Sequence, residues 1–387
     1  MSWPATRTNS RSSPAKPIGC TSPANVWPWW PPKARPMIDS ISLPDGFALP
    51  ITGKPADYPE LPWNTGPRPF AHRHALEAID GAHPAQANAR ALEALMQGAS
   101  SLLFWIHRAE DLPLLLRDVR LDIAPVHLVF GGALEDLAAQ IHALPASQHP
   151  ESLQGSINLD PAEHIIRTGT FWRGSMEADL AQVQKAMPLP TGLRVLCGNG
   201  AAMAAPGHPQ ASVHQLAYGL GSLFAQLDHV GWDHADRAWL SLAASDDYLQ
   251  TIALVQAARS LWETATQKHL QRSAPLWISG RPHLPTPTED ASALIGIGMQ
   301  QQALWLGGCD ELWITPLNDG PQAMDWARQQ VLVLTYENGL QGLDQPLAGS
   351  YTLDGYTVKL QHEVDKLWKH WSARGGFWAQ LQSPTGA

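Results

Sequence analysis

The chain has 387 residues, a formal net charge of −9, and 16% charged against 44% hydrophobic side chains. This composition is typical of a globular protein with a large core and not of a disordered chain. The acidic balance argues against a nucleic-acid partner, and no apolar run reaches the roughly 18–20 residues that span a bilayer. Cys20, Cys197 and Cys309 lie far apart, so we expect neither a disulfide framework nor a zinc cluster, and a reducing cytoplasmic environment.

Residues 1–36 are rich in proline, serine and arginine and lack the apolar core of a secretory signal. We expect a disordered tail here, with two alternatives. The sequence WPWWPP at 27–32 is compatible with a polyproline-type binding motif, or translation starts at Met37 and the preceding stretch is not native. For residues 37–84 we expect an extended segment that wraps over a surface, because 43–69 carries too much proline for a helix or a central strand.

Further along the chain, short apolar runs alternate with segments of helical periodicity. Strands are predicted at 101–107, 125–130, 153–159, 193–197, 237–242, 275–279 and 311–315, with a weak eighth near 340–351. Helices are predicted at 85–98, near 111–119, and at 134–144, 176–187, 211–230, 247–269, 290–306, 321–338 and 357–374. This alternation favours an α/β fold, a (β/α)8 TIM barrel over 85–381, followed by a short tail at 382–387.

General sequence motifs do not indicate a nucleotide or metal site. Gly198-Asn199-Gly200 and Gly296-Ile297-Gly298 lack the third glycine and the acidic residue of a dinucleotide site, and no P-loop is present. We expect no metal site, because the remaining candidates lack metal-ligand spacing and are more typical of solvent-exposed loops. These candidates are His72, His74, Asp233, His234 and Asp236.

Acidic residues follow two of the predicted strands at the C-terminal rim, where the chemistry of such barrels takes place. Asp246 and Asp247 follow the strand at 237–242, and Asp290 begins a helix for which Thr288 is available as N-cap. The pattern favours a helix cap with an acidic first turn over a catalytic carboxylate.

Five segments, in chain order, carry a more specific pattern. They are ANAR at 87–90 with LMQG at 95–98, GSINLDP at 155–161 with RTG at 167–169, QLAY at 215–218, ALWLGGCDELWITP at 303–316, and DQPLAGSYTL at 344–353. Together with Gly375-Gly376 after the last helix, this ordered set resembles the substrate-barrel domain of the methylmalonyl-CoA mutase family. The resemblance extends over about residues 85–381.

The resemblance also implies what is missing. Catalytic members bind adenosylcobalamin through a flavodoxin-like domain whose DxHxxG histidine ligates cobalt. This sequence has no DxHxxG and stops at Ala387, directly after the predicted barrel. We therefore expect no C-terminal flavodoxin-like cobalamin domain and no cofactor bound by this chain.

Catalytic members further carry a Tyr-His pair just after the fourth strand. The corresponding stretch here is CGNGAAMAAPGHP at 197–209. Counting back from the QLAY segment places Met203-Ala204 at the pair, and counting forward from the strand places Asn199-Gly200 there, while His208 is out of register. Neither alignment supplies a ring that hydrogen-bonds a thioester carbonyl, so we expect no catalytic residue in this chain.

Two other family segments are altered. The region of the sixth strand keeps Ser279-Gly280-Arg281, but the helix that begins DASALIGIG at 290–298 lacks the family's arginine. The segment RPFAHRH at 68–74 matches the coenzyme A entry only loosely. The sequence does not decide whether the barrel interior admits coenzyme A, which bulky side chains would block.

The resemblance implies a function that fits these losses: a non-catalytic small subunit of a heterodimeric, adenosylcobalamin-dependent methylmalonyl-CoA mutase of propionate metabolism. Such a chain stabilises a large catalytic subunit that carries the cofactor. The alternatives are an active acyl-CoA mutase barrel working with a separate cobalamin-binding chain, a different barrel enzyme that uses Asp246 or Asp290, and a scaffold protein of the same family. Trp368 and Trp371 share a helix face, with Trp378 beyond, and favour core packing over an interface stripe.

Overall fold

A computed structural model describes residues 74–204, 211–283, 291–320, 322–338, 347 and 349–382, with the backbone alone at 40–42, 48–50 and 291. The first two of these backbone segments pair with each other, β1 (Ser40–Ser42) antiparallel with β2 (Ala48–Pro50). Several predictions fall outside the described residues: the tail at 1–36, most of the segment at 37–84, and Cys20, His72, His208, Thr288 and Asp290.

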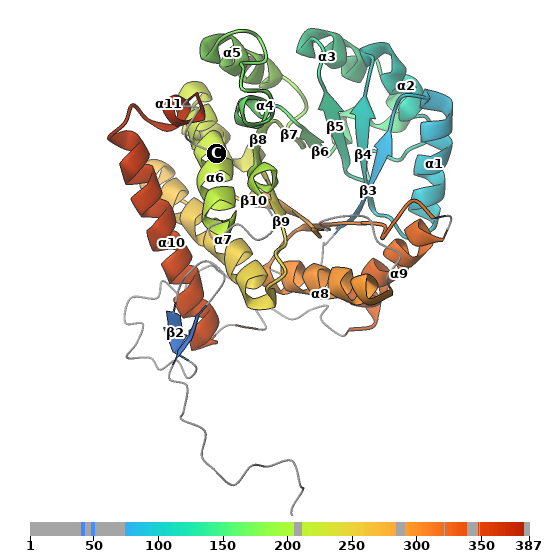
Figure 1. The fold of residues 1–387 in the computed structure, drawn as a ribbon. Helices are drawn as coiled ribbons and strands as arrows, with labels where there is room; N and C mark the ends of the chain where they lie inside the picture. Colours follow the sequence, from blue (N-terminus) through green and yellow to red (C-terminus); the bar gives the residue numbers. More distant parts are fainter. Residues whose placement is uncertain are drawn as a thin grey trace, which may run out of the picture. The chain divides into compact units, whose positions relative to one another are not determined.

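All other described strands form one parallel sheet that closes on itself (Figure 1). The strands are β3 (His74–Asp80), β4 (Ser101–Ile106), β5 (Val126–Phe130), β6 (Gly155–Ile157), β7 (Leu193–Arg194), β8 (Leu196–Asn199), β9 (Ala238–Ala243), β10 (Leu276–Arg281) and β11 (Glu311–Trp313). Only Val195 separates β7, which pairs with β6, from β8, which pairs with β9. Since β11 pairs with β3, the nine strands occupy the eight positions of a closed barrel.

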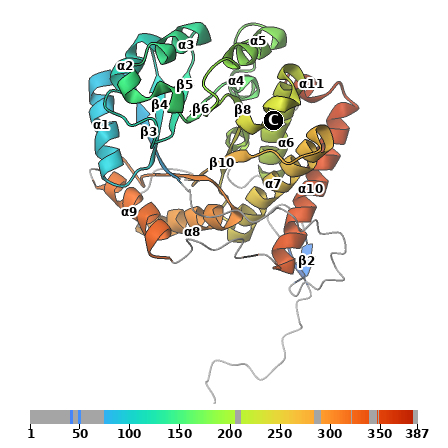
Figure 2. The same cartoon turned by 180° about the vertical axis from the view of Figure 1, so that it is seen from behind.

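Helices surround the strands when the molecule is seen from either side (Figure 2). They are α1 (Pro84–Met96), α2 (Leu112–Leu115), α3 (Leu134–His142), α4 (Pro161–Thr168), α5 (Met176–Ala186), α6 (Ala211–Val230), α7 (Tyr248–Leu270), α8 (Ala291–Gly307), α9 (Ala323–Tyr336), α10 (Tyr351–Ser372) and α11 (Phe377–Leu381). The predicted TIM barrel is therefore confirmed, and the described residues contain no second α/β domain. None of the helices in the described part of the chain combines the length and apolar character needed to cross a membrane.

The eighth strand was predicted in the wrong place. In the region near 340–351, the described residues Leu347 and Gly349 lie in turns and Tyr351 begins α10. The missing strand is instead β3, which lies within the segment expected to be extended, so the barrel begins before residue 85.

An acidic residue in the middle of β3 explains why its sequence, HALEAID, does not have the pattern of a buried strand. Glu77 is fully buried on the outer side of the sheet and forms an ion pair with Arg328 of α9, at 2.8 and 3.0 Å. Arg90 of α1 lies 3.5 Å from the same carboxylate. These contacts tie the first strand of the barrel to its neighbouring helices and provide the pairing that a buried charge requires.

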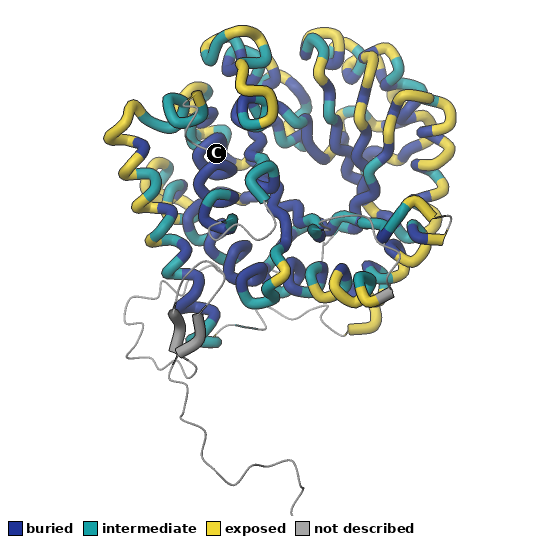
Figure 3. Tube along the Cα trace, in the orientation of Figure 1, coloured by how far each residue is buried: buried dark blue, intermediate teal, exposed yellow. Residues whose placement is uncertain are grey.

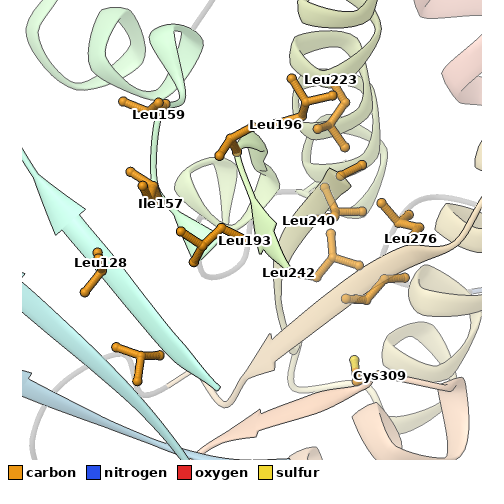
Figure 4. Close-up of a cluster of buried hydrophobic side chains, with 14 of the residues drawn as sticks. Leu128, Ile157, Leu159, Leu193, Leu196, Leu223, Leu240, Leu242, Leu276 and Cys309 are labelled. Carbon is orange, nitrogen blue, oxygen red and sulfur yellow. The ribbon is translucent and has the colours of Figure 1, made fainter. Parts of the chain in front are cut away.

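The main core lies between the strands and the helices (Figure 4). Leu128, Leu240 and Leu276 of three strands belong to this core, together with helix residues such as Leu223 of α6. Because side chains alternate along a strand, every second strand residue faces this core between strands and helices, and the intervening residues face the barrel lumen.

The tryptophans of the last helix belong to this packing. Trp371 is only 4% exposed and lies 4.8 Å, ring to ring, from Tyr218 of α6. The indole of Trp368 donates a hydrogen bond to the carbonyl oxygen of Ala217 at 3.1 Å. The prediction that Trp368 and Trp371 pack against the barrel is confirmed. Trp378, in α11, lies 5.2 Å from the ring of Phe377.

Candidate functional site

The C-terminal mouth of the barrel is the first place to look for a site, because parallel strands of this fold deliver their functional residues there. Two asparagines stand at the ends of neighbouring strand positions: Asn158 directly after β6, and Asn199 as the last residue of β8. Their side-chain Oδ1 atoms are buried and have no hydrogen-bond partner among the described residues. Arg281, at the end of β10, donates to the carbonyl oxygen of Ala201 at 3.0 Å. Amide and guanidinium groups bind polar ligands but exchange no proton near neutral pH.

A buried carboxylate beside this mouth has a structural role. Asp160 caps α4 by accepting from the backbone N–H of Ala162 at 3.0 Å, and it also accepts from the Asn199 N–H and the Ser222 hydroxyl, each at 2.6 Å. Burial, and then the charge of Glu163, raise the pKa of Asp160 to about 6. Three donors from three elements occupy its oxygens, so Asp160 holds α4, β8 and α6 together.

The stretch that aligns with the family's Tyr-His pair carries no ring side chain in its described part, residues 197–204. Asn199-Gly200 ends β8 and begins a 3-10 turn at Gly200–Met203, and Met203-Ala204 ends that turn. Both candidate positions therefore lie at the mouth, and neither presents a phenol or an imidazole there. The nearby imidazole of His283, just after β10, has a buried Nε2 without a hydrogen-bond partner among the described residues.

Inside the lumen, a buried polar cluster centres on Glu311 of β11. Its Oε1 accepts from the Ser101 hydroxyl at 2.6 Å and lies 2.9 Å from Nε2 of His127, and its Oε2 accepts from the Ser279 hydroxyl at 2.8 Å. The other ring nitrogen of His127 is 2.8 Å from the Ser156 hydroxyl. Because β5 and β11 are not neighbours in the sheet, the contact between His127 and Glu311 crosses the lumen. We name these five residues the lumen cluster.

Three tryptophans from adjacent strands fill more of the lumen. Trp239 of β9 is 3% exposed and lies 6.0 Å, ring to ring, from His127. The ring of Trp277 of β10 lies 4.1 Å below the guanidinium of Arg194, and the indole of Trp313 of β11 donates to the Ser279 hydroxyl at 2.9 Å. The lumen therefore carries three indoles and the buried lumen cluster, and Trp277 and Trp313 are partly exposed.

The remaining predicted candidates come together in no site. Asp247 is the N-cap of α7, accepting from the Gln250 N–H at 2.7 Å, so the cap interpretation is confirmed. Asp246 contacts only Gln300, at 3.4 Å, among the interactions of the described residues. His74 was expected in an exposed loop; that expectation is wrong, because His74 begins β3 and its ring lies 5.4 Å from that of Trp277.

The candidate metal ligands, the two GxG motifs and the cysteines also form no site among the described residues. Asp233, His234 and Asp236 lie in a 3-10 turn before β9, and no group of three His, Cys, Asp or Glu residues in the described part of the chain is placed to hold a metal ion. The first GxG ends β8 and the second lies inside α8, so neither forms a strand-to-helix phosphate loop. Cys197 and Cys309 are buried and are not joined in a disulfide, and burial raises the pKa of Cys197.

The lumen cluster was missed at the sequence level, although a signal was present. His127 stands within PVHLVF and Glu311 opens ELWIT, which are polar residues in otherwise apolar strands. Such a residue in a predicted strand of a closed barrel faces either the helices or the lumen, and it needs a partner in both positions. The identity of that partner depends on strands far apart in the sequence.

Comparison with known proteins gives a consistent result. Residues 232–385 match the family model described as methylmalonyl-CoA mutase. The methylmalonyl-CoA mutase small subunit of Porphyromonas gingivalis is 27% identical over 338 residues, or 78% of this chain and 52% of the relative. The small subunit of Streptomyces virginiae is 24% identical over 339 residues, which again is 78% of this chain and 52% of the relative. A probable small subunit of Mycobacterium tuberculosis is 25% identical over 357 residues, or 82% of this chain and 56% of the relative. The chain spans about half the length of these curated relatives.

Proposed function

We propose that this chain is the non-catalytic small subunit of a heterodimeric methylmalonyl-CoA mutase in the cytoplasm. The match of residues 232–385 to the methylmalonyl-CoA mutase family model and the similarity to small subunits support this proposal. The role of this chain is to stabilise a large catalytic subunit. A chain that binds only the folded form of its partner raises that partner's stability by mass action. A permanent heterodimer of this kind buries about 2,000 Å² or more.

The bulky side chains in the lumen are the observation that carries this proposal. A coenzyme A thioester that threads a barrel needs a lumen lined by small side chains. Here Trp239, Trp277 and Trp313 occupy that space, and the buried ion pair between His127 and Glu311 spans it. To open a path, the protein would have to expel packed indoles and leave a buried carboxylate without its partners.

Adenosylcobalamin, which the family uses, does not fit the described residues at the end of β8. The described residues at the end of β8 supply Asn199, Gly200 and Met203, which offer neither a ring to stack nor an acid to transfer a proton. We therefore place the cofactor on the large subunit and derive no step through it in this chain.

The test is an assay of methylmalonyl-CoA rearrangement with adenosylcobalamin present in every sample. The samples contain this chain alone, this chain with a separate cobalamin-binding domain, the large mutase subunit of the same source alone, and both subunits together. We expect turnover only where the large subunit is present. Turnover by this chain with a separate cobalamin-binding domain, and without the large subunit, would instead establish the active-barrel alternative.

A further inference from the structure

Helix α8 has an unusual composition for the outer layer of a barrel. Its seventeen residues, ASALIGIGMQQQALWLG, include no Asp, Glu, Lys or Arg. By contrast, α10 carries Asp354, Lys359, Glu363, Asp365, Lys366 and Lys369. A helix that is apolar on all sides is typical of an element covered on all sides.

One face of α8 is nevertheless exposed (Figure 3). Ile295 is 68% exposed and Met299 51%, and Gly296 between them is also exposed. The spacing of three and four residues puts these side chains on one stripe. The opposite face packs on the barrel through Ile297, which is 1% exposed, and Leu304, which is fully buried.

The neighbouring helix α9 continues the exposed apolar surface. Trp326 is 42% exposed, Val333 41% and Tyr336 71%, at a helical spacing of seven and three residues. A groove of about 460 Å³ runs between the two helices. It is lined only by uncharged residues, namely Leu294, Ile295, Gly298, Met299, Gln302, Trp326, Gln329, Gln330, Val333, Leu334 and Asn338. We call this groove, together with the exposed positions Ile295, Gly296, Met299, Trp326, Val333 and Tyr336, the α8–α9 surface.

The glycines of α8 also indicate a contact with another protein. A Cβ at Gly296 would meet open space, and one at Gly298 would meet only the Gln330 side chain at 3.8 Å. A glycine inside a helix destabilises it relative to alanine. None of the described residues requires the missing side chain at Gly296, whereas a close-packed helix of another protein would.

We infer that the α8–α9 surface is the docking site for the large mutase subunit, which presents an uncharged, apolar helix to the groove. This inference rests on the proposed function. A contiguous exposed apolar patch of this kind marks an interaction surface, and a groove between helices accepts an amphipathic helix. A second copy of this chain is the less favourable occupant, because each copy brings a net charge of −9.

The experiment measures the affinity of the purified large subunit for this full-length chain by calorimetry. The double variant Ile295→Lys/Val333→Lys places two charges on the α8–α9 surface at positions that are already partly exposed. The matched control is Ile123→Lys, at a residue 67% exposed outside this surface. We expect the double variant to bind at least ~100-fold more weakly, because lysines buried without partners are costly, and the control to bind within ~3-fold of wild type. Circular dichroism confirms that both variants are folded.

Each outcome distinguishes the two proposals. Equal affinity of all three proteins would overturn the docking site while leaving the small-subunit function standing. No binding by the wild type would overturn both. Self-association of the wild type that the double variant abolishes, detected by sedimentation, would assign the surface to a homodimer and contradict the inference.

Discussion

The buried carboxylate of Glu311 shows how polar contacts stabilise the lumen of this barrel. Burial raises the pKa of Glu311, but the charge of His127 and the hydrogen bonds from His127, Ser101 and Ser279 outweigh that effect and lower it to about 2. Glu311 is therefore ionised over the whole physiological range. Its stabilising contribution is present above the usual glutamate pKa of 4.5 and is lost as the pH falls toward 2.

We predict that Glu311→Gln reduces the free energy of unfolding at neutral pH by a few kcal/mol. The amide of glutamine carries no negative charge, and its NH2 group would face the hydroxyl and imidazole groups that donate to the carboxylate. The difference between wild type and variant should narrow as the pH falls below about 4.5, because the carboxylate then takes up a proton in the unfolded chain, whereas in the folded protein it stays ionised until the pH approaches about 2. Urea unfolding of both proteins between about pH 7 and about pH 3 measures this difference. A constant difference across that range would contradict the assignment.

The tryptophans of the lumen allow a second prediction at this scale. Trp239→Ala should cost about 3–5 kcal/mol of unfolding free energy, because it leaves a cavity where an indole was 3% exposed. Its Nε1 has no hydrogen-bond partner among the described residues, so the loss reports packing alone. Trp105→Ala is the control: its side chain is 38% exposed at the end of β4, and we expect a loss below about 1 kcal/mol. Similar losses for both would mean that the lumen is not packed.

Individual residues were predicted unevenly from the sequence. The cap at Asp247 follows from local chemistry, since an N-cap needs only the backbone of the next turn. The lumen cluster does not, because His127 and Glu311 meet across 184 residues of chain. Only the closure of the sheet brings them together.

Among the elements, β8 and α6 make the closest backbone contact at the mouth. A Cβ added to Gly198 would lie 2.1 Å from the carbonyl oxygen of Gly219. The strand and the helix approach so closely that neither position admits a side chain. This contact fixes the 3-10 turn after β8, and with it the position that aligns with the family's Tyr-His pair.

Gly198→Ala should therefore destabilise the protein by about 1–3 kcal/mol through overpacking. The matched variant Gly296→Ala, in the open face of α8, should stabilise the isolated chain by about 0.5–1 kcal/mol. Thermal unfolding of the two variants should thus shift the midpoint in opposite directions. Two shifts of the same sign would contradict the packing described for one of these glycines.

Most elements were predictable because local patterns determine them. The strands from β4 to β11 are short apolar runs, and the long helices α6 and α7 have regular spacing, so both kinds were predicted to within a few residues. β3 was missed because its buried Glu77 interrupts the apolar pattern. α4 was not predicted, and α10 begins at Tyr351 rather than 357, since the preceding glycine and proline suggest a turn.

For the molecule as a whole, bulky groups lie in the interior and apolar groups lie on one outer face. The lumen carries indoles and the contact between His127 and Glu311, which a barrel that threads a coenzyme A thioester would have to displace, and an uncharged apolar surface lies on the outside at α8 and α9. On the proposed function, the scaffold has kept its shape while its interactions have moved from the interior to the surface. Binding to a partner is then its only contribution to the reaction.

That contribution is best measured by following the thermal unfolding of the large mutase subunit as this chain is added. We predict that the unfolding midpoint rises by several degrees and stops rising at one equivalent, because a partner that binds only the folded state stabilises it. A midpoint that does not change at any ratio would contradict the account.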